Sequence, residues 1–486
     1  MKVLFISSSF EDDARSKTIN INSHYPMGLA YLHAFLEKYG HTVHTLFLND
    51  YSYADCRKIV LKNVKMHSPD VVGFNIITQN RTASFRLIHH IHKNNPHIRI
   101  LIGGIHTTVM YKQILKRFPY IIAVLGEGEI TAKEILENIH ARKSLRHVDG
   151  IAYVSKRKII KTKNRVLITD LDTLPFPKHE VFFSETRTIA SMITSRGCPF
   201  HCSFCVLNAI TRGYPRKRSV QNVIAEIEYL IATYPQLETI WFHDDQFFLI
   251  NSRVIEFCNE IFRKKIKLKF ICSGRFKPIS KEMVEALEKA GFIQVLLGLE
   301  SGSPKILDLC HKFITHEDVI KAMTLFKNSK IIISTFLIVG LYGETDETVE
   351  ETIRFVQRIQ RIKYLVFVDI GILLVYPGTE IYSIAKKRGF MNDSYWLTEK
   401  PTPFFTVEHS QKQLEEFKKR TLDSIAIGRI LTPSGFPHQY YMIPWIIKFL
   451  IAQTPRYPLY AGHILQRFFP SVYLRAHHLF NRKPLV

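Results

Sequence analysis

The stretch ITSRGCPFHCSFC, which runs from Ile193 to Cys205, crowds three cysteines into eight residues. Cys198, Cys202 and Cys205 follow the spacing Cys-x₃-Cys-x₂-Cys, whereas the other four cysteines of the chain stand singly. The apolar, β-branched run before them predicts a strand that leads into a short loop. Cysteines crowded on one loop favour metal or redox chemistry over a framework of disulfide bonds.

The cysteine loop suits an iron–sulfur cluster better than a zinc ion. A [4Fe–4S] cluster is held by cysteine thiolates, and three thiolates leave one of its irons open. Structural zinc takes four ligands, usually split between two separated pairs. His201 lies inside the loop, where it can hardly turn inward to become a fourth ligand. We therefore expect Cys198, Cys202 and Cys205 to bind a [4Fe–4S] cluster, with zinc as the alternative.

The same strand opens a repeated pattern of strand and helix. Repeated strand–helix units of this length form a parallel sheet, and six of them predict an incomplete (β/α) barrel rather than a closed ring of eight. The expected strands are 189–195, 239–245, 267–275, 293–301, 330–340 and 364–378.

Polar residues stand at the end of each of these strands, where α/β barrels carry their reactive groups. We take Asp244, Asp245 and Tyr376 as the candidate catalytic residues. The two aspartates could hold substrate or accept a proton, or they could cap the next helix. Both interpretations stay open. The strand ends read His243-Asp244-Asp245, Ser273-Gly274-Arg275, Gly298-Leu299-Glu300-Ser301, Gly340-Leu341-Tyr342-Gly343-Glu344 and Tyr376-Pro377-Gly378-Thr379.

Residues 1–150 show five further strand–helix units, which predict a doubly wound parallel sheet. Ligands of such sheets bind at the carboxyl ends of the strands. Two glycine groups lie there, Gly103-Gly104 and Gly126-Glu127-Gly128. Glycines let the backbone approach a ligand closely, although they also serve in plain tight turns. The G-x-G-x-x-G dinucleotide fingerprint is missing after the first strand, which argues against NAD or FAD.

Both halves of the chain resemble one known family, over residues 1 to about 400. A Cys-x₃-Cys-x₂-Cys loop after the first barrel strand, with an aromatic residue (Phe204) before the last cysteine, is the hallmark of the radical S-adenosylmethionine superfamily. The segments PMGLAYLHAFLEKYGHTV (26–43), DVVGFNIIT (70–78), GGIHTT (103–108) and GEGE (126–129) resemble the cobalamin-binding domain of its cobalamin-dependent members. Those members include tetrapyrrole cyclases, hopanoid-modifying enzymes and methyltransferases.

The resemblance implies the cofactors and their residues. The open iron would bind S-adenosylmethionine, which the reduced cluster cleaves to a 5′-deoxyadenosyl radical. Arg275 would contact its carboxylate and Glu300 its ribose, beside Gly298 and Ser301; alternatively, Arg275 and Glu300 pair with each other. The residues implied for cobalamin are Gly103, Gly104, Gly126, Glu127 and Gly128.

Two positions depart from the motifs of this family. The Asp-x-His-x-x-Gly motif is absent, so no histidine is expected on the cobalt, and His106 is interpreted as a surface-loop residue. Tyr342 stands where relatives usually carry proline, which affects the expected shape of that loop rather than the class of protein.

Four regions follow from these patterns: a cobalamin-binding domain (1–150), a linker (151–187), a radical S-adenosylmethionine partial barrel (188–400) and a helical, basic and aromatic C-terminal region (401–486). The net charge is +23, and no acidic residue follows Asp423. Rings and cations such as Trp445 and Lys448 suit either a membrane surface or a cap over the substrate cavity. We expect a cytoplasmic protein, peripheral on the inner face of the membrane if the first alternative holds.

The expected reaction is methyl transfer to an unactivated carbon of a small, lipophilic molecule. Radical cyclisation or rearrangement of a tetrapyrrole-like or hopanoid-like substrate is the first alternative. Modification of tRNA is the second, but the sequence shows neither a second cysteine cluster nor an RNA-binding module, so no nucleic acid is favoured as a partner. A non-enzymatic iron–sulfur or corrinoid carrier would not need the polar residues that stand at the ends of the barrel strands. An electron donor such as flavodoxin or ferredoxin is the expected protein partner.

Overall fold

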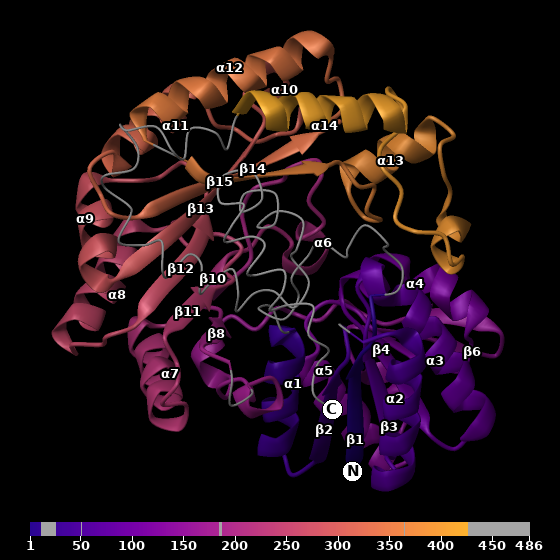
Figure 1. The fold of residues 1–486 in the computed structure, drawn as a ribbon. Helices are drawn as coiled ribbons and strands as arrows, with labels where there is room; N and C mark the ends of the chain where they lie inside the picture. Colours follow the sequence, from indigo (N-terminus) through magenta and orange to yellow (C-terminus); the bar gives the residue numbers. More distant parts are fainter. Residues whose placement is uncertain (11–25, 50, 184–186, 364, 426–486) are drawn as a thin grey trace, which may run out of the picture.

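A computed structural model describes residues 1–10, 26–49, 51–183, 187–363 and 365–425. Two α/β units lie next to each other in it (Figure 1). The N-terminal unit is drawn in indigo and violet, and the second unit, in magenta to orange, curves as an arc of helices around its strands.

The first unit is a seven-stranded sheet in the order β2-β1-β3-β4-β5-β6-β7. Its first five strands are parallel, as predicted, and apolar side chains dominate them because helices cover both faces. The parallel strands are β1 (Lys2–Ser7), β2 (Thr42–Phe47), β3 (Val71–Asn75), β4 (Arg99–Gly103) and β5 (Ile122–Val124). The helices are α1 (Met27–Lys38), α2 (Tyr53–His67), α3 (Arg81–Asn94), α4 (Ile105–Arg117) and α5 (Glu129–His140).

Two antiparallel strands complete this sheet, β6 (Ile151–Ser155) and β7 (Lys158–Lys161). They fall within the segment 151–187 that the sequence assigns to the linker, so the linker begins later than expected. Lys156 and Arg157 form the tight turn of this hairpin, both with positive φ. Because such turns usually carry Asn or Gly, the sequence gives no signal of a hairpin here.

The second unit is a six-stranded parallel sheet in the order β15-β14-β13-β12-β11-β8. Its edge strands β8 and β15 do not pair in the described structure, so the sheet forms the predicted partial barrel. The strands are β8 (Ile189–Met192), β11 (Thr239–Phe242), β12 (Lys269–Gly274), β13 (Phe292–Glu300), β14 (Ile332–Val339) and β15 (Leu365–Ile372). The helices between them are α7 (Val220–Thr233), α8 (Asn251–Arg263), α9 (Lys281–Ala290), α10 (Pro304–Leu309), α11 (His316–Phe326) and α12 (Asp346–Ile362), followed by α13 (Glu380–Lys387) and α14 (Gln411–Ile425).

A short antiparallel pair closes the base of the cysteine loop. β9 (Ser195–Arg196) pairs with β10 (Arg216–Lys217), and the helical turn α6 (Asn208–Thr211) lies between them. Gly197 has a φ of +96°, and a Cβ there would lie 2.5 Å from the carbonyl oxygen of Tyr214. Only glycine therefore allows the chain to turn from β9 into the three cysteines.

No helix of the described residues is long and apolar enough to cross a membrane. The basic and aromatic segment expected after 425 lies outside the described residues.

Candidate active site

The three cysteines lie on the loop between β9 and α6, at the carboxyl end of the first barrel strand. All three are half-buried and carry free thiols. Burial raises the pKa of the Cys198 and Cys205 thiols. The backbone N–H of Ser203 donates to the carbonyl of Cys310 at 3.1 Å, which docks the loop on the end of α10. In the described chain no three His, Cys, Asp or Glu side chains surround one point suited to a single metal ion. The thiolates of an iron–sulfur cluster bind different irons and need no such common point.

Asp244 and Asp245 hold the backbone that leads into this loop. Asp244 accepts hydrogen bonds from the N–H of Thr194 at 2.6 Å and from the hydroxyls of Thr194 and Ser195 at 2.5 and 2.6 Å. Asp245 accepts from the N–H of Gly197 at 2.7 Å. The alternative that this pair caps the next helix is wrong, because α8 begins several residues later, after Ile250.

The two aspartates differ in what they face. Asp244 is buried, and its bonds to the strand end argue against the direct catalytic role expected for it. Asp245 lines the main cavity, where its side chain is accessible although protein surrounds it on most sides. This desolvation raises the pKa of Asp245 to about 6.

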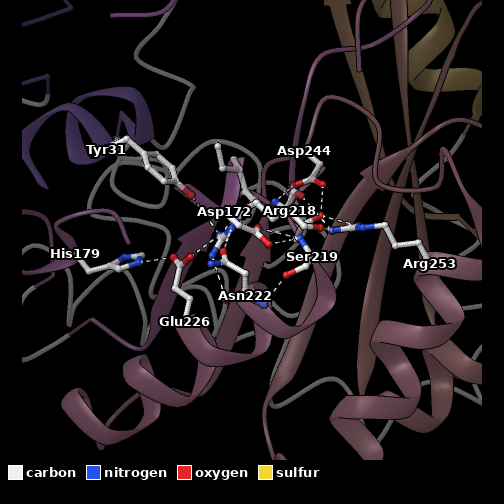
Figure 2. A network of polar contacts seen from close by, with 11 residues as sticks. Tyr31, Asp172, His179, Arg218, Ser219, Asn222, Glu226, Asp244 and Arg253 are labelled. Atoms are coloured by element: carbon white, nitrogen blue, oxygen red, sulfur yellow. Dashed lines mark hydrogen bonds and ion pairs between the residues drawn. The ribbon is translucent and has the colours of Figure 1, made fainter. Parts of the chain in front are cut away.

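A buried network of charged side chains also binds the backbone just before the cysteine loop (Figure 2). Arg253 donates to the carbonyls of Thr194 and Arg218, at 3.1 and 2.9 Å. Arg218 donates to the carbonyl of Ile193 at 2.9 Å and pairs with Glu226 at 2.5 Å. The other oxygen of Glu226 lies 2.8 Å from His179, and both side chains are fully buried.

Arg275 is placed to receive an anionic ligand beside the cysteines. Its guanidinium stacks over the ring of Phe200 at 3.9 Å, and its Nη1 lies 3.6 Å from Cys202 Sγ. The side chain is buried, yet Nε and Nη2 have no hydrogen-bond partner among the described residues. A carboxylate matches the fork of a guanidinium, so the arginine fits the amino-acid end of S-adenosylmethionine.

Glu300 pairs with Lys312 at 2.7 Å, so the alternative pairing with Arg275 is wrong. A Cβ at Gly298 would lie 2.6 Å from Glu300 Oε1, and glycine there makes room for the ion pair. Ser301 is buried, its hydroxyl 3.0 Å from that of Thr352. Gly298, Glu300 and Ser301 thus lie together at the end of β13. The hydroxyl of Ser301 is already hydrogen-bonded within the protein.

The main cavity, about 720 Å³ in volume, opens between the two units. On one side it is lined by the glycine loops of the first sheet. On the other it reaches Arg196, two residues before Cys198, and Leu207, two residues after Cys205. All five residues expected to bind cobalamin line it: Gly103, Gly104, Gly126, Glu127 and Gly128.

The carboxylate of Glu127 bonds to other parts of the chain. It pairs with Arg196 at 3.1 Å and with Arg216 at 2.9 Å, and it accepts from the N–H of Ile168 at 3.0 Å. Burial alone would raise the pKa of Glu127, but the two guanidinium groups lower it. Glu127 therefore remains charged and joins the two units at the cavity wall.

A side chamber of about 290 Å³ adjoins the main cavity, with which it shares Ile77, Gln79 and Ile105. Tyr376 lines this chamber, and its hydroxyl accepts a hydrogen bond from the Gln79 amide at 3.0 Å. Of the three candidate catalytic residues, Tyr376 thus lines the side chamber, Asp245 lines the main cavity and Asp244 lines neither.

His106 also lines the side chamber, and its interpretation as a surface residue is wrong. It lies in the first turn of α4, only 1% exposed, because Trp396 from the C-terminal part of the chain packs against it at 5.8 Å. Its Nδ1 lies 3.1 Å from the Thr78 hydroxyl. Burial lowers the pKa of His106 to about 3, so the ring is neutral.

Sequence reasoning missed the arginines that support the site, Arg196, Arg216, Arg218 and Arg253. Arg196 and Arg216 meet their carboxylate partners from 67 to 89 residues away along the chain. No local pattern marks such partners. The only hint is that several arginines closely follow the cysteine loop.

Comparison with known families agrees with this geometry. The model of the radical SAM superfamily matches residues 192–356, and that of the B12 binding domain matches residues 22–136. The chain belongs to the cobalamin-binding branch of the radical S-adenosylmethionine enzymes. Its cofactors are a [4Fe–4S] cluster, S-adenosylmethionine and cobalamin, as predicted.

Individual relatives match both units of this enzyme. An uncharacterized methyltransferase of Pyrococcus horikoshii is 28% identical over 88% of this chain and 93% of its own length. The anaerobic magnesium-protoporphyrin IX monomethyl ester cyclase of Rubrivivax gelatinosus is 30% identical over 72% of this chain, but only 65% of its own length is covered. The radical S-adenosylmethionine methyltransferase TsrM from Kitasatospora setae shares the fold, with a TM-score of 0.66 and 19% identity over 80% of this chain and 76% of its own.

Proposed function

We propose that the enzyme transfers a methyl group from S-adenosylmethionine, through cobalamin, to an unactivated carbon of a small molecule. The supporting observation is that one cavity is lined both by the glycine loops of the cobalamin-binding domain and by residues flanking the cysteine loop. When bound, the reduced cluster with S-adenosylmethionine supplies a radical that abstracts hydrogen, and cobalamin carries the methyl group. The shared cavity would let one substrate lie beside both sets of lining residues.

The chain's own residues hold the reactants in this proposal. Arg275 binds the carboxylate of S-adenosylmethionine with its free guanidinium edge. Glu300, oriented by Lys312, accepts hydrogen bonds from the ribose hydroxyls. The apolar walls of the cavity exclude water, which protects a reactive radical from side reactions.

The side chamber supports a mainly apolar substrate. Its walls carry the side chains of Ile105, Val109, Val206 and Pro377, and its few polar groups include the Tyr376 hydroxyl. Pockets of this kind bury an apolar body and use a small number of hydrogen bonds to fix its orientation. We place the substrate's non-reacting end in this chamber.

Product analysis separates methyl transfer from the cyclisation alternative without knowledge of the substrate. Donation of the methyl group leaves S-adenosylhomocysteine, whereas radical cleavage leaves 5′-deoxyadenosine. Reduced, reconstituted enzyme loaded with cobalamin should form about one S-adenosylhomocysteine per cobalamin in a single turnover, and cobalamin-free enzyme should form none. Formation of 5′-deoxyadenosine alone, whether or not cobalamin is bound, would favour cyclisation or rearrangement.

Two partners belong to the same proposal. A flavodoxin or ferredoxin would reduce the cluster, and the basic, aromatic segment from about residue 434 would contact an anionic membrane surface that supplies a lipophilic substrate. Co-sedimentation with anionic liposomes should then be lost in high salt and on truncation near Pro433. Equal sedimentation of the full-length and truncated proteins would contradict the membrane contact.

A further inference from the structure

A buried cluster of charges joins the cobalamin-binding loop to the cysteine loop. Arg196 lies two residues before Cys198, and its guanidinium reaches across to the first unit. There it pairs with Glu127 at 3.1 Å and with Glu129 at 2.7 Å, both in the GEGE segment that follows β5. Arg216, on the strand paired with β9, binds the same Glu127 at 2.9 Å.

The cluster is shielded from water. The exposed fraction of the side chain is 14% for Arg196, 9% for Glu127 and 5% for Glu129. The ring of Tyr31, from α1, lies 4.9 Å from the Arg196 guanidinium. Buried ion pairs are screened little by solvent and are sensitive to the loss of one partner, so their geometry is strongly held.

Four side chains of this cluster also border the main cavity. Tyr31, Glu127, Glu129 and Arg196 all line it, beside Gly126 and Gly128. The hydroxyl of Tyr31 also accepts a hydrogen bond from Arg218 at 3.2 Å. This bond links α1 to the buried charged network that binds the backbone before the cysteine loop (Figure 2). A shift in the position of one loop therefore changes the position of the other.

We infer that Arg196 is a positioning residue that couples the cobalamin loop to the cluster loop, so that each cofactor strengthens the binding of the other. A bound iron–sulfur cluster fixes the cysteine loop and with it Arg196. Arg196 then holds Glu127 and Glu129, and thereby the glycines between and beside them, in the arrangement that lines the cavity. This inference uses the same two cofactors as the proposed function, but it does not depend on which reaction follows.

The coupling is measurable as a ratio of affinities. The dissociation constant for hydroxocobalamin is determined by absorbance on full-length protein with and without the reconstituted cluster. Coupling energies between protein sites commonly correspond to changes of about 5- to 150-fold in affinity, and we expect about tenfold tighter binding in the cluster-loaded protein. A wild-type ratio near one would overturn the inference, although cobalamin binding itself would still support the proposed function.

Variants identify the residue responsible. Arg196→Gln should bring the ratio close to one, and Arg196→Lys, which keeps the charge, should restore part of it. Arg86→Gln is the matched control, because Arg86 pairs with Glu399 in a more exposed contact that also joins the first unit to the C-terminal part of the chain. An unchanged ratio in Arg196→Gln would overturn the inference.

A second variant covers the case in which Arg196→Gln no longer holds iron. Glu129→Gln leaves the cysteine loop intact and removes one partner of Arg196. It should keep wild-type iron and lose most of the affinity ratio. Retention of the full ratio in Glu129→Gln would then contradict the coupling.

Discussion

Asp244 shows how a single carboxylate at a strand end can hold the backbone that leads into the cysteine loop. Three donors from Thr194 and Ser195 converge on it, just before the turn into the cysteines. The sequence correctly marked the residue as unusual from its position after a barrel strand. It could not show that the donors come from the neighbouring strand end, because β8 and β11 are adjacent only in the folded sheet.

Removal of the Asp244 carboxylate should loosen the cysteine loop. Asp244→Ala leaves the two buried donors of Thr194 and the half-buried hydroxyl of Ser195 without this acceptor, and each unsatisfied buried group costs about 1–3 kcal/mol. We expect lower thermal stability and less iron per chain after anaerobic reconstitution, with Asp244→Asn intermediate. Asp70→Ala is the control, since Asp70 accepts a backbone hydrogen bond in an exposed position. Wild-type iron content in Asp244→Ala would show that the loop holds its shape without it.

Replacement of Arg275 should weaken the binding of S-adenosylmethionine without lowering the iron content of the cluster. The Nε and Nη2 atoms have no partner in the described residues, and a carboxylate would satisfy them. Arg275→Lys keeps a charge but loses the forked geometry. We expect at least about tenfold weaker binding of S-adenosylmethionine in calorimetric titration, corresponding to about 1.4 kcal/mol. Iron content should stay at the wild-type level, and unchanged affinity would remove Arg275 from the binding site.

At the scale of strands and helices, the prediction was most successful where burial is strongest. The parallel strands of both sheets read as apolar runs because helices cover both faces, and their carboxyl ends carry the candidate site residues. The β6–β7 hairpin was missed because Lys156 and Arg157 form its turn without Gly or Asn. The burial of His106 gives no local signal, because one of the rings that pack against it, that of Trp396, follows 290 positions later.

A buried carboxyl group after the end of β14, that of Glu344, should make the stability of the protein depend on pH. Glu344 is buried and accepts the N–H of Gly340 at 2.5 Å. Burial raises the pKa of Glu344 to about 7, from an ordinary value of 4.5. The folded state thus binds a proton that the unfolded state releases between these values, so this group lowers stability as pH rises from 4.5 to 7.

The variant Glu344→Gln keeps a hydrogen-bond acceptor but cannot ionise. Relative to wild type, it should gain stability as pH rises across this window, by on the order of 3 kcal/mol at pH 7.5 compared with pH 4.5. Thermal unfolding of both proteins at several pH values measures the difference. Parallel stability curves would mean that the carboxyl group is not desolvated in the folded protein.

At the scale of the whole molecule, the site depends on how two separately recognisable units face each other. Each unit could be predicted from its own motifs: the cysteine loop for one, the glycine loops for the other. The contacts between them could not. Arg196 with Glu127 and Glu129, and Arg218 with Tyr31, join segments far apart in sequence, and a charged residue in a sequence does not reveal its partner.

The central claim is that Cys198, Cys202 and Cys205 hold a [4Fe–4S] cluster with one iron open to S-adenosylmethionine. Mössbauer spectroscopy of the full-length protein, reconstituted with ⁵⁷Fe under anaerobic conditions, tests it most directly. The account predicts about four irons per chain, one of which changes its signal when S-adenosylmethionine is added, and loss of the cluster when the three cysteines are replaced by alanine. Four irons that do not respond to S-adenosylmethionine, or full iron retention in the triple variant, would contradict it.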